Sequence, residues 1–196
     1  MLFSPLSADD AMKNFANSTA SLTNNGGVID EFSTSLNLNN EDNQYVNISL
    51  PSNLGNSWTI SLNINPLSTT TSYYHMFSNN GPQSVFALKG CPPVNGCGPY
   101  IYSSELDSFM AGEEFNYSRW HNIIATYNGT TVKIFINGEM MNQVNKSLNI
   151  LSSSFNIGAG NDYKEWGSMR VANLHVYNVA VSDDTINQLS ISGFDI

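Results

Sequence analysis

The chain has 196 residues and a formal net charge of −9; 41% of its residues are hydrophobic and only 12% are charged. This composition favours one globular domain with a sizeable core. The seven Lys and Arg form no cluster, so the chain lacks the positive patch that nucleic-acid binding requires. No apolar run approaches the roughly 20 residues that span a bilayer. We therefore expect neither a nucleic-acid partner nor membrane insertion.

The first 26 residues differ from the rest and are predicted to form an N-terminal arm or linker, with the domain proper at residues 27–196. Residues 7–10 can cap a short helix that ends at Asn14 or Phe15, and the polar stretch 17–27 is typical of a loop. Residues 1–5 lack the basic and long apolar regions of a secretion signal, so we expect no classical signal peptide.

Strand patterns then recur almost to the end of the chain, as short β-rich runs bounded by turn residues. The predicted strands are Phe32–Leu38, Gln44–Leu50, Trp58–Asn65, Tyr73–Ser78, Val85–Leu88, Tyr100–Tyr102, Trp120–Tyr127, Thr131–Ile136, Glu139–Met141, Phe155–Ile157 and Met169–Tyr177. Broken alternation in the last run predicts a bulge near Asn173.

The most informative stretch is Arg119–Met141, in which Asn128-Gly129 and Asn137-Gly138 separate apolar, β-branched runs. Asn-Gly suits a type I′ turn, because both central residues need a positive φ. Each pair is therefore expected to fold one strand back antiparallel on the last.

One helix is predicted, over Asp183–Leu189 with Ser182 as its N-cap and two acidic residues in its first turn. About ten strands with one terminal helix predict an all-β fold, a two-sheet antiparallel jelly-roll sandwich.

Four segments resemble the laminin-G-like domains of the concanavalin A-like lectin/glucanase superfamily. They are Trp120–Gly129, Thr131–Gly138, Phe155–Gly158 and Val171–Asn178. The resemblance implies a concanavalin A-like jelly roll. It also implies a domain that binds glycans or proteins, often with calcium at the rim of the sandwich.

Catalysis is not expected. Glucanases of this fold carry two Glu flanking an Asp on one strand, so that nucleophile and acid share a face. Glu105 and Asp107 resemble the start of that motif, but Met110 stands near where the second Glu belongs. One carboxylate cannot serve as both nucleophile and acid, so a glycoside hydrolase is only a remote alternative.

No cofactor is expected, although the acidic loops leave a calcium ion open, with Asp42 and Asp162 as its candidate ligands. The family's acidic pair is replaced by Ala172-Asn173, which argues against the usual calcium site. Cys91 and Cys97 form either a small disulfide loop in an oxidising compartment or two free thiols in a reducing one.

A glycan site needs aromatic rings beside amides and carboxylates, because a sugar offers an apolar face and a rim of hydroxyls. The candidate ligand-binding residues are Asp162, Tyr163, Tyr74 and Tyr100. Trp166 is expected to pack in the core instead.

Two functions follow. The first is a non-catalytic structural or surface component of a larger assembly, such as a virion, with other proteins as partners. The alternative is a lectin-like module that binds a glycan or protein on its loop rim. The expected location is a virion or another extracellular surface.

Overall fold

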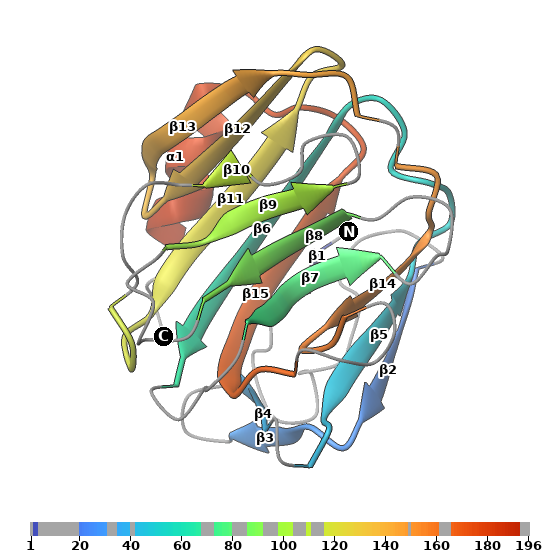
Figure 1. Ribbon diagram of the computed structural model, residues 1–196, viewed down its shortest axis with the longest axis vertical. Helices are drawn as coiled ribbons and strands as arrows, with labels where there is room; N and C mark the ends of the chain where they lie inside the picture. The colour runs from blue at the N-terminus through green and yellow to red at the C-terminus, as the bar shows by residue number, and fades with distance from the viewer. Residues whose placement is uncertain are drawn as a thin grey trace.

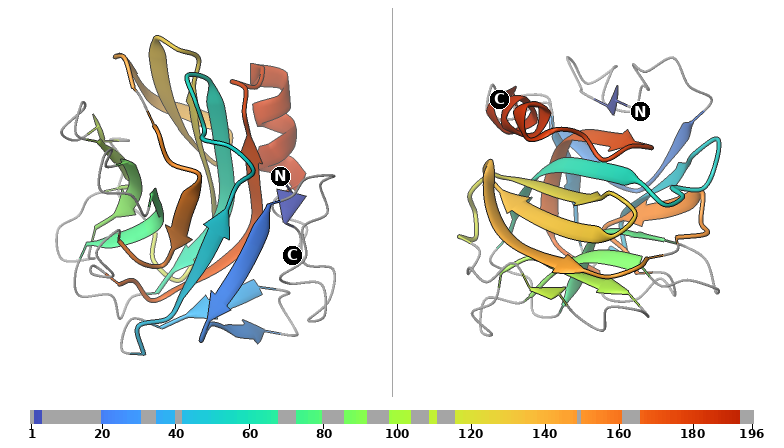
Figure 2. Two further views of the ribbon diagram at one scale, coloured as in Figure 1. Left: turned by 90° about the vertical axis from the view of Figure 1, so that its right-hand side faces the viewer. Right: turned by 90° about the horizontal axis from the view of Figure 1, so that it is seen from above.

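The computed structural model describes residues 2–3, 20–30, 35–39, 42–67, 73–79, 86–91, 98–103, 109–110, 116–148, 150–160 and 166–192. Two antiparallel sheets stack face to face, with one short helix on the outside of one of them (Figures 1 and 2). The predicted all-β jelly-roll sandwich is therefore confirmed.

The first sheet has eight strands. In spatial order they are β13 (Glu139–Asn145), β12 (Thr131–Ile136), β11 (His121–Tyr127), β6 (Trp58–Pro66), β15 (Met169–Tyr177), β4 (Ser35–Leu38) and β3 (Val28–Asp30), with β1 (Leu2–Phe3) paired to β15.

The second sheet has seven strands. In spatial order they are β10 (Phe109–Met110), β9 (Tyr100–Ser103), β8 (Phe86–Gly90), β7 (Tyr74–Asn79), β14 (Ser154–Ile157), β5 (Tyr45–Ser49) and β2 (Ser21–Asn25).

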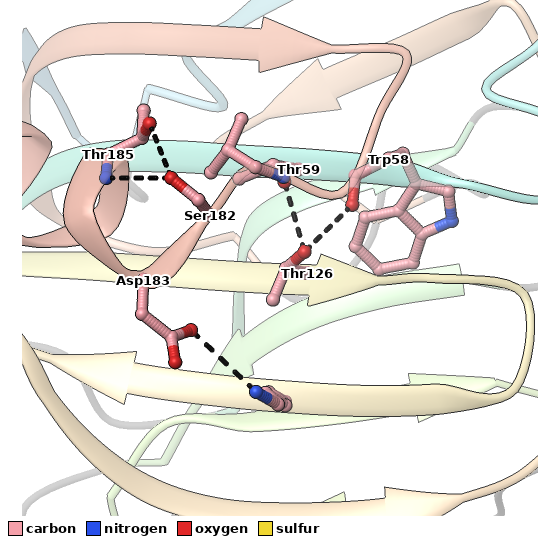
Figure 3. A network of polar contacts seen from close by, with 8 residues as sticks. Trp58, Thr59, Thr126, Ser182, Asp183 and Thr185 are labelled. Atoms are coloured by element: carbon pink, nitrogen blue, oxygen red, sulfur yellow. Dashed lines mark hydrogen bonds and ion pairs between the residues drawn. The ribbon is translucent and has the colours of Figure 1, made fainter.

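The main core fills the space between the sheets. Trp58 is fully buried there, with its ring edge-on to Phe86 at 5.1 Å and tilted against Tyr127 at 5.9 Å. Alternate residues of a strand point to opposite faces, so Thr59 points away from this core. It is nevertheless buried, and its hydroxyl lies 3.0 Å from that of Thr126 (Figure 3).

Helix α1 (Asp183–Ser192) covers part of the outer face of the eight-stranded sheet (Figure 2). Ser182 caps it, since the Ser182 hydroxyl accepts a hydrogen bond from the Thr185 backbone amide at 3.3 Å (Figure 3). Ile186 and Leu189 form a second apolar cluster with Ile124 and Phe135 on that face. The helix extends three residues beyond its predicted end at Leu189.

The two Asn-Gly pairs make different turns. Asn137 and Gly138 both have positive φ, 52° and 86°, as a type I′ turn requires. At the other pair only Gly129 does, at 96°, so the type I′ prediction is wrong there. The Asn128 carboxamide oxygen instead accepts backbone hydrogen bonds from Thr130 and Thr131, which closes a longer loop.

The predicted bulge near Asn173 is confirmed. The register between β15 and β6 shifts between Ala172 and His175, and Asn173 has a φ of 49°.

The boundary of the N-terminal arm needs correction. Residues 21–25 form β2, which pairs with β5 along its whole length, and Leu22 packs against the main core. The polar sequence of β2 suggested a loop because an edge strand exposes much of its surface. The short helix predicted over residues 7–15 lies outside the described residues. Within the described part of the chain, no helix has the length and apolar character needed to cross a membrane.

Candidate binding face on the seven-stranded sheet

The outer face of the seven-stranded sheet carries several polar and aromatic side chains, among them Tyr100 of the predicted binding residues. Phe86, Leu88, Ile101 and Phe155 point into the main core, so their strand neighbours point outward. Residues directly opposite each other on paired strands share a face. One outward row runs Asn47, Asn156, Ser78, Ala87, Tyr102, and a second runs His75, Lys89, Tyr100.

A tyrosine patch, defined as Tyr73, Tyr100, Tyr102 and Lys89, lies at the β9 side of this face. Tyr73 is 42% exposed and its ring stands edge-on to that of Tyr100, with centroids 6.2 Å apart. The Lys89 ammonium lies 5.4 Å from the centre of the half-buried Tyr102 ring. The patch combines exposed aromatic surface with a cation held over a ring.

Tyr74 cannot contact a ligand, and its prediction as a binding residue is corrected. It is fully buried. A Cβ on Gly90 would lie 2.2 Å from the nearest carbon of the Tyr74 ring, and a Cβ on Gly167 would lie 2.5 Å from the Tyr74 Cβ. Burial is the main cause that raises the pKa of Tyr74 well above its ordinary value, and the neighbouring Tyr117 raises it further. Strand alternation turns Tyr74 inward, so Tyr73 is the exposed member of the pair.

Tyr100 needs a milder correction. It was predicted on the loop rim, but it lies in strand β9 and is only 7% exposed. Its ring supports Tyr73 rather than offering a surface of its own.

At the β5 side of the same face, two amides and two aromatic rings come together. The Asn47 amide nitrogen donates to the Asn156 carboxamide oxygen at 3.0 Å. The Tyr45 and Trp166 rings are 5.7 Å apart, and both side chains are half-buried. Trp166 therefore packs against a ring on the outer face and lies outside the main core.

Several predicted residues fall outside the described part of the chain: Asp162, Tyr163, Glu105, Asp107 and Cys97. The residues on either side of the Asp162 segment are described. Ser78 donates to the backbone oxygen of Ala159 at 2.7 Å, and Trp166 packs on Tyr45. Both flanks therefore contact the outer face of the seven-stranded sheet. Cys91 is buried and disulfide-bonded.

Asp42, the other candidate calcium ligand, is exposed, and its carboxylate accepts a hydrogen bond from the Asn39 amide at 3.0 Å. No three His, Cys, Asp or Glu side chains gather as a metal site within the described ranges. Since Asp162 is outside those ranges, the calcium site stays a prediction. His121 is buried with its Nε2 2.9 Å from the Asn116 backbone oxygen, a structural position.

The sequence profile described as the concanavalin A-like lectin/glucanases superfamily matches residues 39–187, more than half of the chain. The resemblance predicted from the sequence is thereby confirmed. No protein with a curated description matches the chain in sequence.

Among solved structures, the sandwich is similar to domain 4 of AbnA, a GH43 extracellular arabinanase from Geobacillus stearothermophilus, solved with arabinotriose. The TM-score is 0.71 at 17% identity, and 96% of each chain is covered. It is also similar to the binding domain of botulinum neurotoxin serotype D, with a TM-score of 0.77 at 14% identity. The match covers 98% of this chain and 51% of that domain.

Another structure of the serotype D ligand-binding domain, in complex with N-acetylneuraminic acid, matches with a TM-score of 0.75 at 13% identity, over 98% of this chain and 50% of that one. The chain thus spans about half the length of these toxin domains. At such identities the likeness shows the fold alone.

Proposed function

The chain belongs to the concanavalin A-like lectin/glucanases superfamily, and from this premise we propose that it is a non-catalytic, lectin-like module. It binds a glycan on the outer face of its seven-stranded sheet. The observation that carries the proposal is the tyrosine patch, where Tyr73 and Tyr102 are partly exposed and Lys89 lies over a ring.

The chemistry of this patch suits a sugar. The apolar side of a pyranose or furanose ring stacks on an aromatic face, while hydroxyls at its rim need donors and acceptors. Tyr73 and Tyr102 supply ring surface and phenol groups, and the Lys89 ammonium supplies a donor. Domain 4 of the arabinanase, which matches over 96% of each chain and was solved with arabinotriose, supports the idea that a sandwich of this shape can carry a sugar.

A glycan array followed by calorimetry tests the proposal, with and without calcium. We expect Tyr102→Ala and Tyr73→Ala each to weaken binding about tenfold, which corresponds to about 1.4 kcal/mol. Tyr177→Ala is the matched control, because Tyr177 is a half-buried tyrosine on the other sheet. No binding on the array under either condition, or binding that survives the Tyr73/Tyr102 double substitution, would overturn the proposal.

The absence of catalysis is part of this proposal. The Glu105 motif lacks its second Glu, and a single carboxylate cannot complete either glycosidase mechanism. We expect no release of reducing sugar from arabinan or β-glucan; measurable hydrolysis that Glu105→Gln abolishes would contradict this. A place on a virion or another assembly surface remains a separate prediction, testable by detecting the chain in purified particles.

A further inference from the structure

Tyr73 and Tyr102, the accessible rings of the tyrosine patch, lie on opposite sides of Tyr100 along the strand direction. Strands β7 and β9 both pair antiparallel with β8, so they run the same way (Figure 1). In the register of β8, the first residue of β7 lies one residue level before Tyr100. Tyr73, which precedes β7, thus lies two levels before Tyr100, and Tyr102 lies two levels after it.

These two rings are too far apart for one sugar ring to contact both. The Tyr73 and Tyr100 ring centroids are 6.2 Å apart. Tyr100 and Tyr102 are two residues apart on β9, which separates them by about 6.6 Å along the strand. The levels from Tyr73 to Tyr102 thus cover about 13 Å along the strand direction. A pyranose ring is about as wide as a tyrosine ring, so a sugar that packs on one of them leaves the other uncovered.

The surface between the two rings suits a chain of linked sugars. Tyr73 is exposed and Tyr102 is half-buried, whereas Tyr100 between them is almost fully buried. Accessible aromatic surface is therefore concentrated at the two ends of this span. Once one sugar unit packs on one ring, its linkages hold the following units near the other ring. The second contact then forms at a high effective concentration.

We propose that the tyrosine patch selects its ligand by chain length, an inference that rests on the proposed lectin function. One sugar unit packs on Tyr73, a later unit of the same chain packs on Tyr102, and the linked units between them pass over Tyr100. The ligand class is therefore an oligosaccharide or a stretch of polysaccharide. A monosaccharide reaches only one of the two rings and binds correspondingly weakly.

A glycan array graded by chain length, followed by calorimetry, tests this proposal. The array carries mono- to hexasaccharides of arabinose, xylose, mannose, galactose and glucose, together with sialylated glycans. The protein is produced in bacteria that form disulfides, because Cys91 is disulfide-bonded. The variants are Tyr73→Ala, Tyr102→Ala and their combination, with Tyr73→Phe to keep the ring and Tyr177→Ala on the other sheet as the control. Thermal melting shows which variants fold.

We expect the wild-type chain to bind a hexasaccharide at least about tenfold more tightly than the matching monosaccharide. Tyr73→Ala and Tyr102→Ala should each weaken hexasaccharide binding about tenfold. Together they should weaken it about a hundredfold, because the effects of distant, independent contacts add in free energy. Each of the two should also flatten the dependence on chain length, whereas Tyr73→Phe and the control should retain it.

The two proposals fail in different ways. If monosaccharides bind as tightly as hexasaccharides, or if the folded double variant is no weaker than either single variant, selection by length is refuted while the lectin function stands. If the array returns only terminal single sugars, the same conclusion holds. If no glycan binds, or if binding survives the double substitution, both proposals are refuted. The length dependence of the wild-type chain decides the matter even where a variant does not fold.

Discussion

Gly138 should be among the glycines most sensitive to substitution, because it combines a left-handed backbone with a close neighbour. Its φ is 86°, and a Cβ there would lie 3.2 Å from the Ser190 Cβ and 3.3 Å from its hydroxyl oxygen. Ser190 is in the last turns of α1 and donates to Asn122 Oδ1 at 3.2 Å. Gly138→Ala is therefore expected to strain the turn and to push the end of the helix off the sheet.

The expected loss is the sum of two effects. Placing an L side chain in the left-handed region costs about 1–2 kcal/mol. The tight contact with Ser190 adds about 1 kcal/mol or more, as overpacking does. For a chain of this length, each kcal/mol lowers the melting temperature by about 2–4 °C. Thermal unfolding followed by circular dichroism should thus show Gly138→Ala melting roughly 4–12 °C below the wild type.

Gly55 supplies the matched control. Its φ is 73°, but a Cβ there would meet nothing within 4 Å. Gly55→Ala should therefore show the backbone cost alone, a drop of about 2–8 °C. Combining Gly138→Ala with Ser190→Gly should recover the extra loss in a double-mutant cycle. Equal melting temperatures for the two glycine variants, or no coupling with Ser190, would refute the proposed contact.

Gly90→Ala is expected to lower stability by about 3 kcal/mol in urea unfolding, because its Cβ would lie 2.2 Å from the fully buried Tyr74 ring; an unchanged midpoint would contradict this. Ser182→Ala should cost about 1 kcal/mol by removing the cap on the Thr185 amide, and Ser182→Asp should restore most of it. Burial lowers the pKa of His175 from 6.5 to about 4. The unfolded chain therefore gains a proton first, and folding stability should fall as the pH drops from 6.5 to 4. His175→Gln should remove up to about 3 kcal/mol of that fall, and identical pH profiles for variant and wild type would count against it.

Local chemistry made the strands and turns predictable. Thr131–Ile136 and Met169–Tyr177 begin and end where the sequence placed them, and the Asn173 bulge followed from broken alternation. The order of strands was not predictable. β6 lies between β11 and β15, although all three are far apart in the chain. Such pairings depend on core packing between distant segments, which a single sequence does not encode in any local pattern.

The residues of the binding face could be predicted from the sequence only in part. Tyr100-Ile101-Tyr102 alternates, so both tyrosines could have been assigned to one face from the sequence. The meeting of Asn47 with Asn156 could not, since it depends on the register of two strands more than a hundred residues apart. Asn47 and Asn156 resemble the many other Asn in the chain until that register is known.

Buried amides are hydrogen-bonded differently on the two outer faces of the sandwich. Beneath α1, Asn122 Nδ2 donates to Asn63 Oδ1 at 2.8 Å, and Asn122 Oδ1 accepts from Ser190. The helix thereby completes this network and closes the surface. Away from the helix, Asn65 Oδ1 and His175 Nδ1 are buried without a partner in the described structure. An unpartnered polar atom alone therefore does not mark a binding site.

The amide pair on the seven-stranded sheet has neighbours that Asn65 and His175 lack. The Asn156 donor lies beside an acceptor on half-buried Asn47, and Trp166 offers a partly exposed ring next to them. A fully apolar pair in place of the amides would avoid the desolvation penalty of about 1–3 kcal/mol. Asn156 itself is 0% exposed, so a ligand on this side of the face could contact only the half-buried Asn47 and the partly exposed Trp166 ring.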